Sequence, residues 1–359
     1  MQNSLEKLSN RALPRSFVLE LTRSCNHACM YCYTAWGAQD LNYDAGNQKE
    51  LTTEEVFTIV SRLQDECPVQ TIALSGGEPL LRRDLPEILT FIRGRGIDSM
   101  IITNGMLLTP EKVEQTLVGG NYEVTLLSTN PEIHDRLAGC PGAWEAAIDG
   151  MVNIRRGGGN LAVAFIATKL NYQDLHHTVE LAIALGAYAL MYNRLNLGKY
   201  NLRFAPILFP SPEMVQENLD TLEEMADKYK LPISISVVCE PCVIDTQRYQ
   251  HIHFGYCPLA GGDSYFTIDP RGNIRVCNHS PVILGNMLQE SFTGIYYNHP
   301  YLQKFRQTMP EECNDCKPEW KEVCGGGCKA AAEQCFGNLD HVDPFVTISK
   351  GTEKNIPLN

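Results

Sequence analysis

Three cysteines close together near the N-terminus constrain this chain more than any other feature. Cys25, Cys29 and Cys32 lie within eight residues, in the order C-x3-C-x2-C. Three thiolates on one short loop can ligate three irons of a four-iron cluster and leave the fourth iron without a protein ligand. A zinc site, with His27 beside the cysteines, and a set of buried free thiols are the alternatives. The spacing favours an iron–sulfur cluster with one open iron.

Length, charge and composition exclude several classes of protein. The chain has 359 residues, 44% of them apolar, which is enough for one large domain and a smaller one. Its net charge of −12 argues against a nucleic-acid partner and against an anionic membrane surface. No apolar run is long enough to span a membrane, and the first residues do not resemble a secretory signal, so we expect a cytoplasmic protein. In a reducing cytoplasm, fourteen cysteines indicate metal ligands rather than disulfides.

Strands and helices are predicted to alternate through the first half of the chain. A strand at 17–22 leads into the cysteine loop, and a second at 71–74 ends in a Ser-Gly-Gly-Glu-Pro stretch. Four more strands are predicted at 99–103, 122–128, 161–168 and 187–192, with amphipathic helices between them. Such βα units predict a parallel sheet with ligands at the carboxyl ends of its strands. Periodicity leaves open a partial barrel, a full barrel and a doubly wound sheet.

The glycine-rich stretch after the second strand suits a binding site. Gly76 and Gly77 carry no Cβ, so a ligand can approach the backbone closely. Glu78, which precedes Pro79, offers a carboxylate to a cation such as an ammonium group. A simple turn would have the same sequence.

The two motifs together resemble the radical S-adenosylmethionine (SAM) superfamily, in which the glycine-rich stretch follows the three cysteines by about fifty residues, as here. The resemblance also includes Tyr31, just before the third cysteine. It implies an α/β fold with a partial (β/α)6 TIM-like barrel. It further implies a [4Fe-4S] cluster whose open iron binds SAM, which one electron cleaves to a 5′-deoxyadenosyl radical.

The resemblance also assigns contacts with SAM. The expected SAM-binding residues are Tyr31, Gly76, Gly77, Glu78, Pro79, Asn104, Ser128 and Arg194, with Asn193 beside the last. Asn104 and Ser128 follow the third and fourth strands, where ribose and methionine contacts are usual, and Arg194 is expected to reach the SAM carboxylate. An Asn or Ser at a strand end also serves as a cap or turn residue. His134 and Asp135 resemble a pair found in related maturases, although solvated turn residues would look the same.

Seven further cysteines form a C-terminal array: Cys257, Cys277, Cys313, Cys316, Cys324, Cys328 and Cys335. Between the first two, residues 264–276 are predicted to form a hairpin with a Pro/Gly turn. The array resembles the SPASM extension of radical SAM enzymes. The predicted organisation is an N-terminal extension (1–16), the barrel (17–205), a bridging region (206–256) and a SPASM domain with its C-terminal tail (257–359).

The resemblance implies two auxiliary [4Fe-4S] clusters. The nearer takes Cys257, Cys277 and Cys328, and the farther takes Cys313, Cys316, Cys324 and Cys335. The nearer cluster keeps an open iron or is completed by Cys239, Cys242 or Asp263. Two departures from the family pattern affect these assignments: seven residues separate Cys316 from Cys324, where five are usual, and six separate the last two cysteines. A pair of zinc sites is the alternative.

Enzymes with this extension mostly modify peptides, so the resemblance predicts a radical SAM maturase that crosslinks, epimerises or excises part of a ribosomally made precursor peptide. Sulfatase maturation is disfavoured because Asn278 occupies the position at which those enzymes have an Asp that acts as a base. The expected partners are the peptide, a reductant such as flavodoxin or ferredoxin, and a separate recognition protein, since sixteen residues before the barrel are too few for a recognition domain. The alternatives are tetrapyrrole side-chain chemistry and a non-enzymatic electron-transfer or zinc scaffold.

Overall fold

A single curved sheet organises the computed structural model, which describes residues 12–34, 49–255, 257 and 265–351. Among these residues the sheet has eleven strands, in the order β11-β10-β9-β1-β2-β3-β4-β5-β6-β7-β8. The strands are β1 (Ser16–Thr22), β2 (Thr71–Gly76), β3 (Asp98–Thr103), β4 (Gly120–Thr125), β5 (Asn160–Ala167), β6 (Ala189–Arg194), β7 (Ile233–Ile235), β8 (Ile252–Phe254), β9 (Tyr265–Ile268), β10 (Asn273–Arg275) and β11 (Gly285–Asn286).

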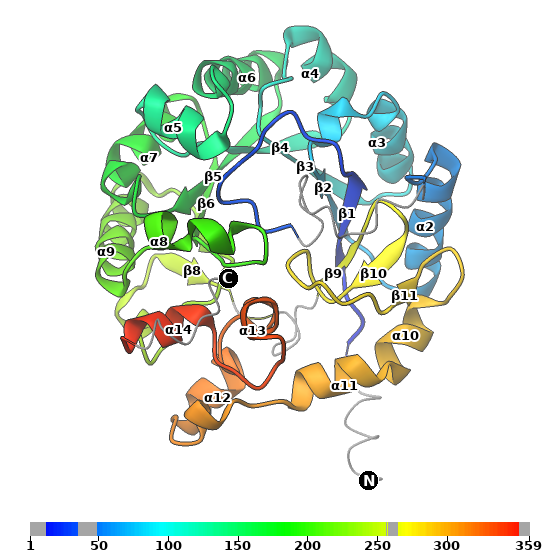
Figure 1. Cartoon of the computed structure of the whole chain (residues 1–359). Coiled ribbons are helices and arrows are strands. Elements are labelled where there is room, and N and C mark those ends of the chain that lie inside the picture. Colours follow the sequence, from blue (N-terminus) through cyan, green and yellow to red (C-terminus); the bar gives the residue numbers. More distant parts are fainter. Residues whose placement is uncertain (1–11, 35–48, 256, 258–264, 352–359) are drawn as a thin grey trace.

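Strands β1 to β8 are all parallel and follow one another in sequence order. Figure 1 shows them as an incomplete ring with the helices on its outer side. The helices of this part are α2 (Thr53–Glu66), α3 (Leu85–Gly94), α4 (Pro110–Thr116), α5 (Pro131–Ala138), α6 (Ala143–Gly157), α7 (Leu175–Ala184), α8 (Ala205–Leu208) and α9 (Pro212–Tyr229). The predicted α/β fold with a partial (β/α)6 barrel is confirmed.

Local sequence explains where these helices begin and which face they bury. Thr52 caps α2, and its hydroxyl accepts from the Glu55 N–H while the Glu55 carboxylate accepts from the Thr52 N–H. Apolar residues then recur at helical spacing and lie in the core against the sheet: Val56, Ile59, Val60 and Leu63. Because capping and periodicity agree, the helix was predictable from sequence.

The C-terminal hairpin extends the barrel sheet rather than forming a separate one. Strand β9 pairs in parallel with β1, so that Val18 lies opposite Thr267, and β10 returns antiparallel to β9. The predicted hairpin is therefore present. Arg275 on β10 donates to the buried carboxylate of Glu20 on β1, which ties the hairpin to the first barrel strand. Sequence patterns indicate the two strands but not that they join.

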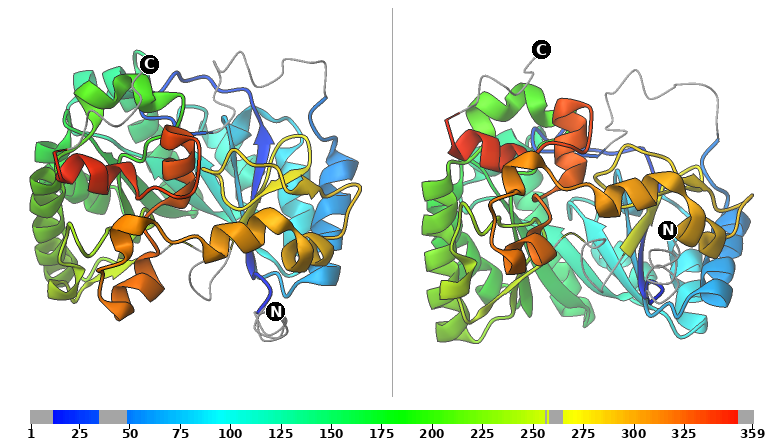
Figure 2. Two further views of the ribbon diagram at one scale, coloured as in Figure 1. Left: turned by 60° about the horizontal axis from the view of Figure 1, so that its bottom comes forward. Right: turned by 90° about the horizontal axis from the view of Figure 1, so that it is seen from below.

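The bridging region extends the other edge of the sheet. Strands β7 and β8 continue the parallel order beyond β6, past the point where the sequence pattern of the barrel stops. Helices α10 (Phe292–Asn298), α11 (Pro300–Gln307) and α12 (Pro318–Cys324), orange in Figures 1 and 2, run across the side where the ring of strands is not closed. Helices α13 (Lys329–Phe336) and α14 (Pro344–Ser349) follow them.

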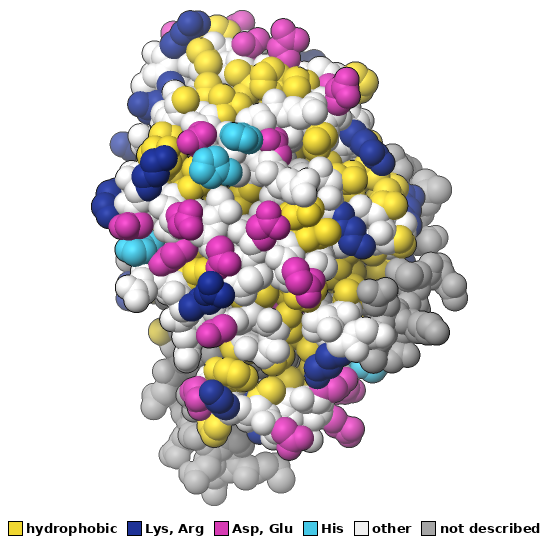
Figure 3. Space-filling view, turned by 90° about the vertical axis from the view of Figure 1, so that its left-hand side faces the viewer, with side chains coloured by type: hydrophobic (Ala, Val, Ile, Leu, Met, Phe, Trp, Pro, Cys, Tyr) yellow, Lys and Arg dark blue, Asp and Glu magenta, His cyan; other side chains and the backbone are white. Residues whose placement is uncertain are grey.

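The face that carries α7 and α9 has side chains of both charges. Figure 3 shows acidic side chains interspersed with lysines and arginines there. Among the described residues on this face, no continuous basic patch is seen. No helix in the described part of the chain is long and apolar enough to span a membrane.

Candidate functional site

The loop with the three leading cysteines is seated against the glycine-rich stretch. The Gly77 N–H donates to the Thr22 carbonyl, and the Glu78 N–H donates to the Ser24 carbonyl, each at 2.8 Å. A Cβ on Gly77 would lie 2.1 Å from the Ser24 oxygen, and Gly76 has a φ of +126°. Only glycine fits both positions, because the loop backbone occupies the space of a side chain. The glycines therefore position the cysteine loop.

Helix α5 holds the other side of this loop. The N–H groups of Ala28 and Met30 donate to carbonyls at the end of α5, and a Cβ on Gly139 would lie 2.3 Å from the Ala28 oxygen. His134 is buried on α5, where its Nδ1 accepts from the Leu127 N–H, and burial lowers its pKa to about 4. Asp135 accepts backbone N–H groups at the start of α6. The structure therefore gives this pair positioning contacts within the protein.

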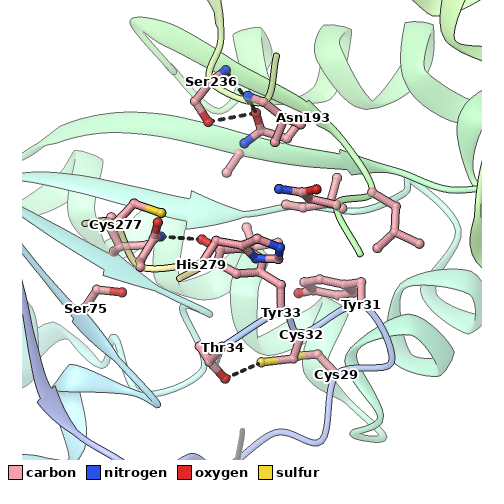
Figure 4. A pocket seen from close by; sticks show the side chains of 18 of the residues that line it. Cys29, Tyr31, Cys32, Tyr33, Thr34, Ser75, Asn193, Ser236, Cys277 and His279 are labelled. Carbon is pink, nitrogen blue, oxygen red and sulfur yellow. Dashed lines mark hydrogen bonds between the residues drawn. The ribbon is translucent and has the colours of Figure 1, made fainter. Parts of the chain in front are cut away.

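A cavity of about 300 Å³ opens at the carboxyl ends of the barrel strands. We call it the barrel cavity. Three groups of residues line it: the loop with Cys25, Cys29 and Cys32, the ends of strands β2 to β6, and the cysteines Cys257, Cys277 and Cys328. Figure 4 shows Cys29, Cys32 and Cys277 on its walls. Two predicted ligand sets, more than two hundred residues apart in sequence, thus lie on one cavity.

The remaining loop residues connect the two sets. The Cys32 thiol and the Thr34 hydroxyl are 3.2 Å apart. Tyr33 accepts from the Asn278 amide at 2.6 Å and contacts the His279 ring edge to face (Figure 4). Tyr31 lies in the same cavity wall, where its carbonyl accepts from Asn201. Sequence reasoning missed Tyr33 because only the fold brings it to the hairpin.

Burial sets the protonation of the thiols that line the barrel cavity. Burial raises the pKa of Cys25 and of Cys277 to about 11, so each is a neutral thiol at pH 7 without a metal. Coordination to iron would favour the thiolates. Polar atoms that are buried and have no hydrogen-bond partner among the described residues lie around the cavity: His27 Nε2, Asn196 Oδ1 and His279 Nδ1. These atoms offer hydrogen bonds to a bound group.

A second cavity of about 360 Å³ lies among the short C-terminal helices. We call it the C-terminal cavity. Its walls include Cys242, Cys313, Cys316 and Cys324, with Trp320 beside them. Cys335 does not line it, although sequence spacing assigned that residue to the farther cluster. In the described part of the chain, no group of three His, Cys, Asp or Glu side chains is close enough to hold a single metal ion. A cubane takes each thiolate on a different iron, so its ligands surround it more loosely.

Comparisons with known proteins agree with the motifs. The family model for the Radical SAM superfamily matches residues 19–182, and the SPASM model, an iron-sulfur cluster-binding domain, matches residues 257–317. An AdoMet-dependent heme synthase from Methanosarcina barkeri is 30% identical over 368 residues, which cover 94% of this chain and 97% of the relative. The chain belongs to the radical SAM superfamily. It is a SPASM-type member and an enzyme.

Other relatives are similar in sequence or in fold. A PqqA peptide cyclase from Granulibacter bethesdensis is 27% identical, with 94% of this chain and 88% of the relative covered. The crystal structure of Streptococcus suis SuiB bound to the precursor peptide SuiA has a TM-score of 0.73 at 15% identity, over 95% of this chain and 77% of that one. Native anSMEcpe with AdoMet and a peptide has a TM-score of 0.69 at 16% identity, over 96% of each chain. These structures share the fold of this radical SAM chain.

The predicted SAM contacts fall into two groups in this radical SAM fold. Tyr31, Gly76, Gly77, Asn104 and Arg194 line the barrel cavity, whereas Glu78, Pro79 and Ser128 do not. The Glu78 carboxylate is buried and accepts from Leu80 N, Thr103 Oγ1 and Asn104 N. Burial nevertheless raises its pKa to about 7. The Ser128 hydroxyl donates to Asp174. That these residues contact SAM stays a prediction.

Arg194 lines the barrel cavity, but its guanidinium is paired with buried acidic side chains. Its Nη2 lies 2.9 Å from Asp343, 3.1 Å from Glu240 and 3.1 Å from the Val238 carbonyl, and all three charged side chains are buried. The guanidinium also lies over the Phe345 ring. Sequence reasoning expected it to bind the SAM carboxylate. The observed partners support a positioning role, since they join β6 to the bridging region and the C-terminal segment.

One acidic residue on the barrel cavity was missed. Glu123 lies on β4, faces the cavity, and has no polar partner among the described residues. Burial raises its pKa to about 7. In sequence it resembles any polar residue of a strand, and only the register of β4 turns it inward.

Proposed function

We propose that this radical SAM enzyme modifies a ribosomally synthesised peptide. The proposal rests on the barrel cavity, where the three leading cysteines and the nearer auxiliary cysteines line one space. Cys25, Cys29 and Cys32 would hold the SAM-binding [4Fe-4S] cluster, and Cys257, Cys277 and Cys328 would hold an auxiliary cluster. The farther auxiliary cluster would occupy the C-terminal cavity. When bound, the first cluster and SAM supply the abstraction of an unactivated hydrogen atom.

The protein's own part is to place the substrate and keep water out. The cavity walls carry Tyr33, Asn278 and Asn193, which present aromatic and amide groups to a bound chain. The Asn193 side chain is held in place because its Oδ1 accepts from the Ser236 N–H, the Ser236 hydroxyl and the Val237 N–H (Figure 4). Amides and aromatic rings suit the hydrogen bonds and apolar side chains of a peptide. A fixed wall of this kind would orient one C–H bond for reaction.

Two kinds of relative support the peptide proposal. PqqA peptide cyclases match 94% of this chain, and the fold is shared with SuiB, whose structure holds a precursor peptide. Asn278 follows the hairpin's second cysteine, which disfavours the sulfatase-maturase reaction. Crosslinking, epimerisation and excision of a backbone fragment remain the candidate outcomes. A small recognition protein and a flavodoxin or ferredoxin reductant complete the proposed set of partners.

Tetrapyrrole side-chain chemistry is the second candidate, because the AdoMet-dependent heme synthase is 30% identical over nearly its whole length. Propionate side chains would call for cations in the cavity. Three cationic side chains line it among the described residues: Arg23, Arg194 and Lys329. Arg194 pairs with two carboxylates, and the Lys329 ammonium donates to the Phe305 and Thr308 carbonyls at 2.7 Å. These engagements favour the peptide.

Co-expression with a precursor peptide tests the proposal. The gene would be expressed with each short peptide encoded beside it, and the peptide would be analysed by mass spectrometry. We expect a defined mass change on the peptide, absent with the Cys29→Ala variant. In parallel, the reconstituted enzyme would be given an iron porphyrin with propionate side chains. Turnover of the porphyrin, with unchanged peptides, would contradict the proposal.

A further inference from the structure

The C-terminal cavity contains a cysteine from outside the SPASM array. Cys313, Cys316 and Cys324 line it, as their close spacing leads one to expect, and Cys242 from the bridging region lines it as well. Of these lining residues, Cys242 is exposed, whereas Cys313 and Cys324 are buried. Three nearby thiols need one more to surround a cubane with protein ligands. The fold supplies a fourth thiol at this place.

Cys242 lies close to the other thiols of the C-terminal cavity. The side chains of Cys313, Cys316 and Cys324 are each near enough to interact electrostatically with that of Cys242. Such interactions arise between groups that lie close together.

Cys335, the residue that spacing assigned to the farther cluster, has different surroundings. It lies on α13, is 3% exposed, and belongs to the main hydrophobic core of the barrel. It lines neither the barrel cavity nor the C-terminal cavity. Burial raises its pKa to about 12, as for an inert core thiol. The residues after Cys335 that line the C-terminal cavity are Val342, Val346 and Lys350, and none of them is a thiol.

A rigid turn fixes Cys242 in place. The N–H groups of Val243 and Ile244 donate to the Glu240 carbonyl, at 2.8 and 2.9 Å, so the chain turns tightly around Cys242. The Glu240 side chain is buried and paired with Arg194, which anchors the start of this turn. Cys239 points instead into the core, where it is 2% exposed. The two cysteines of the Cys-Glu-Pro-Cys segment therefore have different surroundings, and one of them faces the cavity.

We propose that Cys242 is the fourth protein ligand of the farther auxiliary cluster, together with Cys313, Cys316 and Cys324. Cys335 is then a core residue. The nearer cluster keeps Cys257, Cys277 and Cys328, and Cys242 is no longer a candidate to complete it; Asp263, the oxygen candidate, lies outside the described residues. The inference rests on the proposed function insofar as the C-terminal cavity must hold a cluster.

The test uses full-length protein whose three leading cysteines are replaced by alanine, so that the auxiliary clusters are observed alone. Four proteins are compared after anaerobic reconstitution: this parent and its Cys313→Ala, Cys242→Ala and Cys335→Ala derivatives. Iron and acid-labile sulfide per chain and the electron paramagnetic resonance spectrum of the reduced protein are measured. We expect Cys313→Ala and Cys242→Ala each to lose about one to four irons per chain, and Cys335→Ala to match the parent.

Alkylation of the parent gives a second measurement that does not depend on the variants folding. Cys242 is modified with iodoacetamide before and after reconstitution and quantified by mass spectrometry, with Cys140, which lines neither cavity, as the reference. We expect reconstitution to protect Cys242 at least fivefold relative to Cys140. Equal modification in both states would overturn the proposal.

The outcomes also separate this inference from the proposed function. Iron in Cys313→Ala equal to the parent would mean that the C-terminal cavity holds no cluster, and both proposals would fail there. Loss in Cys313→Ala with none in Cys242→Ala would leave the cluster in place and overturn the ligand assignment. A loss in Cys335→Ala as large as that in Cys242→Ala would overturn it as well.

Discussion

The two cysteine-lined cavities of this radical SAM enzyme are built differently. The barrel cavity takes its thiols from three distant segments, around residues 25–32, 257–277 and 328. The C-terminal cavity takes three of its four thiols from residues 313–324. Distant segments must be held by the fold, whereas neighbouring cysteines are held by their own short connections.

Buried ion pairs and close backbone contacts hold the distant segments together around the barrel cavity. Glu20 and Arg275 tie the hairpin to β1, and Arg194 ties β6 to Glu240 and Asp343. The Asp343 carboxylate also accepts from the Cys328 N–H at 3.0 Å. Arg194 therefore lines the barrel cavity and is connected to the C-terminal cavity through Glu240, which lines that cavity two residues before Cys242. We therefore expect substitutions around the barrel cavity to affect cysteines that are distant in sequence, and we expect substitution of Arg194 to affect both cavities.

The largest expected effect is that of Arg194→Met. The substitution leaves two buried carboxylates without their cation, and breaking such a buried pair costs about 3–5 kcal/mol. We expect the free energy of unfolding of the apoprotein to fall by that amount, and iron content to fall in both cavities. Urea unfolding and iron analysis measure these quantities. As a control, Asp227→Asn removes the exposed partner of Lys230 and should leave both unchanged. A loss of iron from only one cavity would contradict the expectation that Arg194 affects both cavities.

Gly77→Ala should act on the barrel cavity alone. Its Cβ would lie 2.1 Å from the Ser24 oxygen, so the cysteine loop must move, at a cost of about 3 kcal/mol. We expect iron at the three leading cysteines to be lost while the auxiliary clusters remain, as judged by iron analysis and spin quantification.

The matched control is Gly94→Ala at the end of α3, where no atom lies within 4 Å of the added Cβ. It should retain all its iron and be as stable as the parent or slightly more so. Equal iron in both glycine variants would show that the close contact does not position the loop.

A buried acid gives the barrel cavity a distinctive pH dependence. Because burial raises the Glu123 pKa to about 7, the folded protein retains a proton that the unfolded chain loses above about pH 4.5. Stability contributed by the neutral acid is complete below pH 4.5 and is lost as pH rises through 7. We expect Glu123→Gln to stabilise the apoprotein at pH 8 by about 3 kcal/mol and to have little effect at pH 4.5. Urea unfolding of the parent and the variant between pH 4.5 and pH 8 measures this difference. A difference in the free energy of unfolding that does not change with pH would contradict the prediction.

The smallest expected effect calibrates the others. Thr52→Ala removes the cap of α2, a helix that carries none of the cysteines of the two cavities, and should cost about 1 kcal/mol of stability. Thermal unfolding should show the loss, while iron in both cavities stays at the parent level. Iron loss in this variant would mean that iron content simply follows global stability.

Local features of the fold could be predicted from sequence. The Thr52 cap and the apolar face of α2 specify that helix within a few residues, and the hairpin is indicated by its turn at Gly272. The pairing of β9 with β1 could not be predicted, because it joins residues about 250 positions apart through backbone hydrogen bonds that any β-rich segments can form. The addition of β7 and β8 to the barrel edge was missed for a different reason, because each strand has only three residues and so carries little sequence pattern.

In the candidate site, too, some residues could be predicted from sequence and others could not. The leading cysteines and the two glycines were identified because their spacing is itself the signal. Arg194 was expected at SAM, but its acidic partners Glu240 and Asp343 are remote in sequence and only the fold reveals them. Cys242 was considered for the nearer cluster, and the structure places it at the other cavity. Spacing predicts ligands that share a loop, and it does not predict one contributed by a distant segment.

The central claim is that the three leading thiols hold a cluster with an iron open to SAM. Release of 5′-deoxyadenosine from SAM by anaerobically reconstituted, dithionite-reduced protein tests it most directly, with the Cys25→Ala, Cys29→Ala, Cys32→Ala triple variant as the control. We expect release by the parent and none by the variant. No release by iron-loaded parent protein, or equal release by both proteins, would contradict it.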